Sequence, residues 1–147
     1  MEIRRIREPE LPAAMDLCWR VFQEFEAPDY PPKGVEAFYT YISNTEQVKH
    51  LTIFGAWEHQ HLQGVLAAEE SHIALFFVDP VIHRQGTGRK LFQAYLAESG
   101  CRRVTVHSSP YAVKVYRHLG FFPAAEEQVS PDGIRYTPMI WEQKTES

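Results

Sequence analysis

The sequence has few cysteines and no long apolar run, and each absence narrows the class of protein. Its two cysteines, Cys18 and Cys101, stand far apart and match no metal-ligand or C-x-x-C spacing. His59 and His61 are close together, but they flank a predicted hairpin turn. We therefore expect reduced, buried thiols and no metal site. No stretch approaches the roughly 18 consecutive apolar residues of a transmembrane helix, so the sequence predicts no membrane partner.

An excess of basic charge is also missing. The chain has 15 lysines and arginines against 19 aspartates and glutamates, for a net charge of -4. Nucleic-acid-binding domains normally present a basic face, so this balance argues against a nucleic-acid partner. The charged residues at the start of the sequence precede no apolar run, which is not the pattern of a secretory signal. We expect a cytoplasmic protein.

What is present is typical of one globular domain. The 147 residues are 44% hydrophobic and 23% charged, and they contain no repeat, linker or low-complexity segment. This length is enough for one core and short for two. We therefore predict a single domain over residues 1–147.

Periodicity and turn signals predict alternating helices and strands. Predicted strands lie at residues 2–6, 51–57, 62–68, 73–78, 103–107, 121–127 and 135–141, and predicted helices lie at residues 11–25, 35–43, 87–98 and 111–119. The three closely spaced strands of residues 51–78 predict an antiparallel meander. The order β-α-α-β-β-β-α-β-α-β-β predicts an α/β (α+β) fold, with a mixed sheet of about seven strands flanked by four helices.

A turn with two glycines, Gly86 and Gly88, joins the strand that ends at Val78 to the next helix. Glycines at a helix start let a ligand approach the free backbone N–H groups, and these groups favour an anion. The spacing excludes a Walker A loop, and Leu91 stands where a dinucleotide fingerprint needs its third glycine. A tight turn without a ligand is an equally good interpretation of the two glycines alone.

The residues around this turn make the pattern more specific. The segment V-D-P-x-x-H-R-Q-G-T-G-R-x-L-F resembles the acetyl-CoA-binding motif R/Q-x-x-G-x-G/A of the GNAT superfamily of N-acetyltransferases, with His83 in the R/Q place. The resemblance implies a mostly antiparallel GNAT-like sheet and acetyl-CoA as co-substrate. It also implies that the pyrophosphate binds to backbone amides of Arg84, Gln85, Gly86, Thr87, Gly88 and Arg89. The pantetheine arm would pair with Phe76, Phe77 and Val78 like an added strand.

A second block lies about 30 residues further on. Residues 108–121 are similar to the later GNAT motif N-x-x-A-x-x-x-Y-x-x-x-G-F, with Ser109 in place of asparagine. The resemblance implies that Ser109 is one of the cofactor-binding residues. Ala112, Tyr116, Gly120 and Phe121 match the motif. The resemblance implies that Tyr116 is the general acid that protonates the departing thiolate. The alternative is that Tyr116 is an aromatic residue packed on the sheet.

The general base is less well defined by the sequence. A strand period of two would place His72 on the same face as Ala74, Phe76 and Val78, at a position comparable to a glutamate base of some GNAT members. An imidazole suits proton abstraction near neutral pH. A histidine that merely follows the preceding turn is an equally good interpretation.

Residues 22–38 mix carboxylates with aromatic side chains and could attract a cationic amine to the acceptor cleft. The carboxylates are Glu24, Glu26, Asp29 and Glu36, and the aromatics include Phe25, Tyr30 and Phe38. An ordinary solvated loop and helix face would show the same composition.

These patterns together predict an acetyl-CoA-dependent N-acetyltransferase that acts on a primary amine of a small molecule or peptide. That the acceptor is an amine is implied by the resemblance alone. A non-catalytic acyl-CoA-binding sensor with the same cleft remains the alternative, while a nucleic-acid module built on His83, Arg84, Arg89 and Lys90 has too few charges. Aromatic residues near the C-terminus, Tyr136 and Trp141, could pair with a second copy in a homodimer.

Overall fold

The computed structural model describes residues 1–80 and 86–144, and within these ranges five α-helices accompany eight strands. The helices are α1 (Leu11–Phe25), α2 (Pro32–Ser43), α3 (Thr45–Val48), α4 (Thr87–Ser99) and α5 (Val113–His118). The strands are β1 (Glu2–Arg5), β2 (Thr52–Glu58), β3 (His61–Glu69), β4 (His72–Val78), β5 (Arg103–Ser108), β6 (Phe122–Pro123), β7 (Gln128–Val129) and β8 (Arg135–Glu142). None of the described helices is long and apolar enough to cross a membrane.

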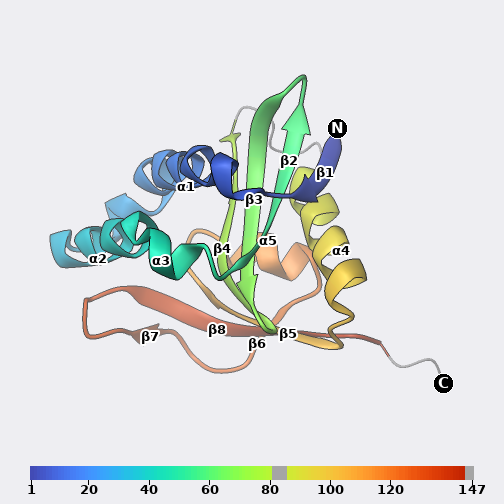
Figure 1. The fold of residues 1–147 in the computed structure, drawn as a ribbon. Coiled ribbons are helices and arrows are strands. Elements are labelled where there is room, and N and C mark those ends of the chain that lie inside the picture. Colours follow the sequence, from blue (N-terminus) through green and yellow to red (C-terminus); the bar gives the residue numbers. More distant parts are fainter. Residues whose placement is uncertain (81–85, 145–147) are drawn as a thin grey trace.

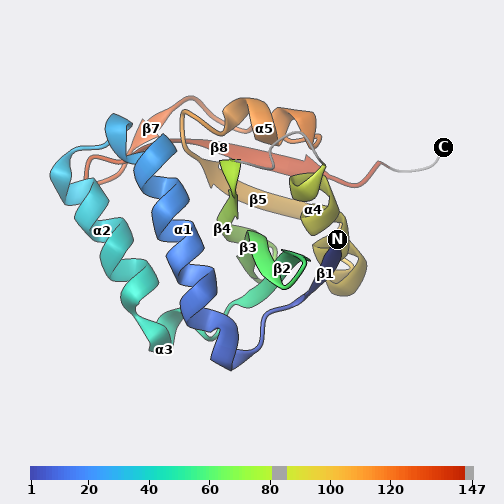
Figure 2. The same ribbon diagram turned by 90° about the horizontal axis from the view of Figure 1, so that it is seen from above.

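The strands form one mixed sheet in the order β1-β2-β3-β4-β5-β8-β6, and β7 pairs with β8. All neighbours are antiparallel except β4 and β5, which run parallel. Figure 1 shows the sheet with α1, α2 and α3 to one side and α4 to the other. Seen from above in Figure 2, α1 and α2 cover one face, whereas α4 and α5 cover the opposite face.

Each face of the sheet has its own apolar core. The first core joins α1 and α2 to the sheet, and the second joins α4 and α5 to the opposite face. Alternating residues of β3 divide between them, because Val65 and Ala67 belong to the first core and Leu66 and Ala68 to the second. Strand β3 is therefore buried on both sides and lies at the centre of the molecule.

Sequence periodicity explains the long helices. In α1, Leu11, Met15, Cys18 and Phe22 recur at steps of three and four, and all four are buried against the sheet. Helix α4 ends at Gly100, whose φ of 67° is in the left-handed region that glycine adopts without strain. The bounds of α1 and α4 are within one residue of the predicted ranges 11–25 and 87–98.

The predicted fold is confirmed, with small differences near the C-terminus and after α2. The single strand predicted at residues 121–127 is two short strands, β6 and β7, because Pro123 cannot donate a ladder hydrogen bond and the residues that follow are exposed. Helix α3 was not predicted; the Asn44 side chain accepts a hydrogen bond from the Gln47 N–H at 3.2 Å and caps it. Both cysteines are free thiols, with Cys18 buried and Cys101 only partly buried.

Candidate active site

The central feature of the site is a split between the parallel strands β4 and β5. The two strands pair only at His72 with Thr105 and at Ile73 with Val106. The backbone ladder between β4 and β5 stops at Ile73. Side chains from both faces of the sheet can therefore approach one another through this gap.

A cavity of about 550 Å³ lies on the α4 and α5 side of the split, and we call it the α4 cavity. Its floor is the end of β4, from Phe76 to Val78, and its rim is the start of α4, from Gly86 to Arg89. Residues of α5 and its flanks close the far wall, among them Tyr111, Ala112, Tyr116 and Leu119. The predicted cofactor-binding residues in the described ranges thus surround one cavity, except Ser109. The predicted residues Arg84 and Gln85 lie outside the described ranges.

The start of α4 offers backbone groups with little side-chain cover. Gly86 stands before the helix with a φ of 74°, and a Cβ there would meet no atom within 4 Å. A Cβ at Gly88 would lie 3.5 Å from the Phe76 ring, inside the cavity. The first N–H groups of a helix have no intrahelical acceptor, so they favour an anionic group at this position.

Two side chains of the first turn of α4 are already engaged. The Arg89 guanidinium donates a hydrogen bond at 2.7 Å to the backbone carbonyl of His118 and ties α4 to the end of α5. Thr87 is buried, and its hydroxyl lies 3.6 Å from the Met1 sulfur. An anion at this turn would therefore meet backbone amides more than the Thr87 hydroxyl.

Tyr116 of α5 lines the α4 cavity and packs in the second core. Its side chain is 6% exposed, and its ring packs edge-on against Phe76 and Phe121 with centroid distances of 5.9 and 5.3 Å. Burial raises the pKa of Tyr116 well above its usual value, and the negative charge of Glu26 raises it further. The phenol therefore keeps its proton at neutral pH.

A second cavity of about 390 Å³ opens on the α1 and α2 side, and we call it the aromatic cavity. Rings from Phe22, Tyr30, Phe38 and Tyr136 line it, together with the side chains of His107 and Asp132. Phe22 and Phe38 stack with ring centroids 3.9 Å apart. Five residues line this cavity and the α4 cavity alike: Glu26, Phe76, Phe77, Ala112 and Tyr116. The two cavities meet at the split.

Glu26 is the charged residue at this junction. Burial raises the pKa of its carboxyl to about 7, although a hydrogen bond from the Ser109 hydroxyl acts in the opposite direction. Ser109 is itself buried, and its oxygen also accepts the Ala112 N–H at 3.2 Å. Ser109 thus links the Glu26 carboxyl to the chain that leads into α5.

His72 lies beside the aromatic cavity and does not line it. It lines a hollow beside α2 that shares Phe38, Ile73, Ala74, His107 and Ile134 with that cavity. There its Nδ1 is 2.8 Å from the Thr105 hydroxyl, and its ring contacts His107 with centroids 4.9 Å apart. Burial lowers its pKa, and His107 lowers it further. The structure does not bring His72 to the cavities that contain Tyr116, and its role as a base stays a prediction.

The predicted common face of His72, Phe76 and Val78 is wrong. Leu75 pairs with Ala67 of β3 and Ile73 pairs with Ala68, so Ala74 is an extra residue in the ladder. Such a β-bulge reverses the alternation of side chains on the strand. His72 therefore faces α2, whereas Phe76 and Val78 pack on the second core.

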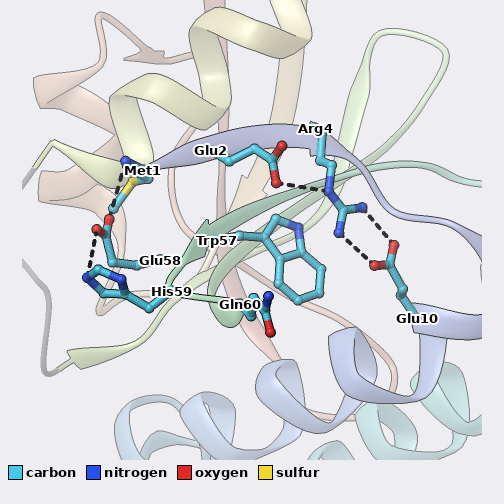
Figure 3. Close-up of a pocket in the computed structure, with 8 residues that line it drawn as sticks. All are labelled: Met1, Glu2, Arg4, Glu10, Trp57, Glu58, His59 and Gln60. Carbon is cyan, nitrogen blue, oxygen red and sulfur yellow. Dashed lines mark hydrogen bonds and ion pairs between the residues drawn. The ribbon is translucent and has the colours of Figure 1, made fainter.

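A hollow of about 570 Å³ beside β1 is a poorer candidate for chemistry (Figure 3). Arg4 is its main cation, and its guanidinium lies 4.6 Å from the centre of the Trp57 ring and donates hydrogen bonds of 2.9 and 2.7 Å to Glu10. These hydrogen bonds hold the pKa of the Glu10 carboxyl well below its usual range. The charges are thus already paired, and the hollow shares no residue with the two cavities at the split.

The glycine turn before α4 and the buried Tyr116 thus line one cavity, as the resemblance to the two GNAT motifs implies. Residues 26–143 match the family model described as acetyltransferase (GNAT) domain. The chain belongs to the GNAT acetyltransferase family. No curated protein matches the chain in sequence.

Solved structures resemble the whole chain. A GCN5-related N-acetyltransferase from Rhodopseudomonas palustris superposes with a TM-score of 0.82 at 15% identity, covering 96% of this chain and 94% of that one. The PaiA N-acetyltransferase from Thermoplasma acidophilum, in complex with coenzyme A, gives 0.71 at 14% identity, with 96% and 98% covered. A ribosomal-protein-alanine N-acetyltransferase from Brucella melitensis gives 0.68 at 14% identity, with 97% and 99% covered. At these identities the likeness shows the fold.

Proposed function

We propose that the protein is an acetyl-CoA-dependent N-acetyltransferase that acts on a primary amine of a small molecule or peptide. The observation that carries this proposal is the meeting of two cavities at Tyr116. One cavity begins at the glycine turn of α4, and the other opens on the opposite face of the sheet. A thioester and an amine could therefore enter from different sides and react at the split.

The α4 cavity suits the CoA part of the donor substrate. The start of α4 presents backbone N–H groups to a pyrophosphate, and Gly86 and Gly88 leave the approach free of side chains. The apolar walls beside β4 suit a pantetheine arm, which could pair with the edge of β4 left open by the split. The complex of the Thermoplasma relative with coenzyme A supports this assignment by analogy.

The aromatic cavity suits a cationic amine. Aromatic faces and carboxylates both attract ammonium groups, and this cavity combines Phe22, Phe38 and Tyr30 with the carboxylates of Glu26 and Asp132. An amine bound there would lie beside Tyr116. This composition favours an amine over an anionic or neutral acceptor.

The proposed reaction is a direct transfer. The amine nitrogen attacks the thioester carbonyl carbon, the carbon–sulfur bond breaks, and the departing sulfur takes the phenolic proton of Tyr116. Because Tyr116 is buried and its pKa is raised, it holds this proton until a thiolate forms beside it. General acid catalysis of this kind contributes about 10²- to 10⁴-fold to a rate.

The test combines a CoA-binding titration with a screen of amines in which free thiol release is followed. We expect binding of CoA and turnover with at least one class of primary amine. Tyr116→Phe should keep the Kd for CoA within about threefold and lower kcat by about 10²-fold or more. Gly88→Leu, which fills the cavity beside Phe76, should weaken CoA binding while the protein stays folded.

Each negative result has a distinct meaning. Binding of CoA without turnover on any acceptor class would replace the enzyme with an acyl-CoA sensor. Failure of the wild-type protein to bind CoA would refute the assignment of the α4 cavity. Full kcat in Tyr116→Phe between pH 6 and 9 would refute the general acid.

A further inference from the structure

Glu26 is the charged side chain that lines both cavities, and the proposed reaction has not yet used it. It follows the last residue of α1, so the helix brings it to the open end of the split. We propose that Glu26 is the general base that removes a proton from the acceptor amine. This inference rests on the proposed function and adds a second catalytic residue to it.

The position of Glu26 fits this role. It shares the aromatic cavity with the rings that would hold the amine, and it shares the α4 cavity with Tyr116, which would face the thioester sulfur. Glu26 and Tyr116 both line both cavities, so a carboxylate and a phenol lie at the junction where the amine and the thioester would meet. One reaction centre would thus have both a proton acceptor and a proton donor.

The groups around Glu26 favour a base that works near neutral pH. Cys18, Tyr30, Tyr111 and Tyr116 lie close enough for the charge of Glu26 to raise their pKa values, and His107 and Asp132 line the aromatic cavity with it. Burial raises the pKa of Glu26 itself to about 7, and the Ser109 hydroxyl limits this rise. The carboxylate is therefore ionised in the slightly alkaline range and basic enough to accept a proton from an ammonium group.

The charge of Glu26 also couples the two proton transfers. Burial and the negative charge of Glu26 both raise the pKa of Tyr116, in that order of size. Once Glu26 accepts a proton from the amine, its charge no longer acts on Tyr116. The phenol then becomes a stronger acid at the stage when the thiolate needs a proton.

The protons balance in this scheme. Glu26 takes one proton from the ammonium group, and the neutral nitrogen attacks the thioester carbonyl carbon. The carbon–sulfur bond breaks, and the sulfur takes the proton of Tyr116. The second proton on the attacking nitrogen returns to Tyr116 as the amide forms, and Glu26 releases its proton to solvent. The products are the amide, the free thiol and one proton.

The decisive experiment is the pH profile of kcat/KM for the wild type and Glu26→Gln with an acceptor found in the screen. The wild-type activity should fall as pH decreases through about 7, because the carboxylate is then protonated. The kcat/KM of Glu26→Gln should be about 10²- to 10³-fold lower at pH 8. Its profile should also lack this fall at low pH, the acid limb. Glu26→Asp should recover part of the rate, and Ser109→Ala should move the limb to higher pH.

Three further variants separate Glu26 from its neighbours. Glu24 is exposed on α1 and lines neither cavity, contrary to its predicted place in the acceptor cleft, so Glu24→Gln should keep activity within about twofold and keep the limb. His72→Asn and His107→Asn should also keep the limb at its wild-type pH. A limb that disappears in either histidine variant and persists in Glu26→Gln would overturn the proposal and return the base to a histidine.

An NMR titration of Glu26, which needs no catalytic turnover, tests this inference separately from the proposed function. The carboxyl carbon resonance that Glu26→Gln removes from the NMR spectrum should titrate near pH 7 in the wild type, with or without CoA. If the wild type acetylates amines and Glu26→Gln keeps both rate and limb, Glu26 is not the base but the proposed function stands. If the wild type has no activity on any amine, the proposed function itself fails.

Discussion

Replacing Glu26 with glutamine should stabilise the protein in alkaline solution. Burial raises the pKa of the carboxyl from its ordinary 4.5 to about 7. Below pH 4.5 the group is protonated in both the folded and the unfolded chain. Between these values the unfolded chain loses the proton while the folded chain retains it, so the free energy of unfolding falls as pH rises. Above about pH 7 the carboxyl is ionised in both states, and the free energy of unfolding is lowered by the full cost of burying the charge.

The size of this cost follows from the two pKa values. At about 1.4 kcal/mol for each pKa unit, the difference corresponds to about 3 kcal/mol. Solvent reaches Glu26 from the two cavities and screens part of its charge, so we expect a net gain of about 2 kcal/mol for Glu26→Gln at pH 8. For a chain of this length, that corresponds to a rise in Tm of about 4 to 8 °C. Glutamine keeps the shape of the side chain and an oxygen for the Ser109 hydroxyl.

The assay is thermal unfolding of both proteins at pH 4 and at pH 8, followed by circular dichroism. The Tm difference between variant and wild type should be near zero at pH 4 and several degrees at pH 8. Glu24→Gln, which removes an exposed carboxylate two residues away, should show no such difference at either pH. An equal Tm difference at both pH values, or a variant less stable than the wild type at pH 8, would refute the reasoning.

Three substitutions test other parts of the fold by chemical denaturation at pH 7. Gly86→Ala should lower the free energy of unfolding by about 1 to 2 kcal/mol, because the residue has a φ of 74°, which alanine adopts only with strain. A Cβ there would meet no other atom within 4 Å, so an unchanged stability would contradict a left-handed turn at this position. Leu66→Ala should lose about 2 to 5 kcal/mol, since this side chain is fully buried in the second core, and a loss below 1 kcal/mol would mean that the core rearranges. Tyr95→Phe should lose about 1 kcal/mol with the hydrogen bond from its hydroxyl to the Glu70 carbonyl at 2.9 Å, and no loss would mean that this bond contributes nothing net.

The helices and long strands are predictable from the sequence because their signals are local. The apolar period in α1 and the glycines at both ends of α4 depend only on neighbouring residues, and the structure matches them closely. The short strands β6 and β7 are harder to predict, since each has two residues and gains its pairing from β8. Propensity says little about segments of that length.

The candidate site is less predictable, and two residues show why. The bulge at Ala74 has no glycine or proline to mark it, so a strict period of two placed His72 on the wrong face. The sequence analysis placed Glu26 in an acidic and aromatic segment. Its environment depends on residues far along the chain, because Ser109 donates a hydrogen bond to it and Tyr116 lines the same cavities. A single glutamate just after an amphipathic helix carries no sequence signal that distinguishes a buried carboxyl from a solvated one.

The split between β4 and β5 has a consequence for solubility. A sheet usually leaves its backbone open at its two outer strands, where any other extended chain can add and start aggregation. Here the part of β4 beyond its pairing with β5 lies in the interior of the sheet, with β3 on one side and β5 and β8 on the other. A gap of this kind can receive one thin, flexible chain threaded from its end, whereas the strand of another folded protein, held within its own sheet, cannot enter. The edge of β4 that the proposed pantetheine arm would use is thus withheld from the strands of other proteins.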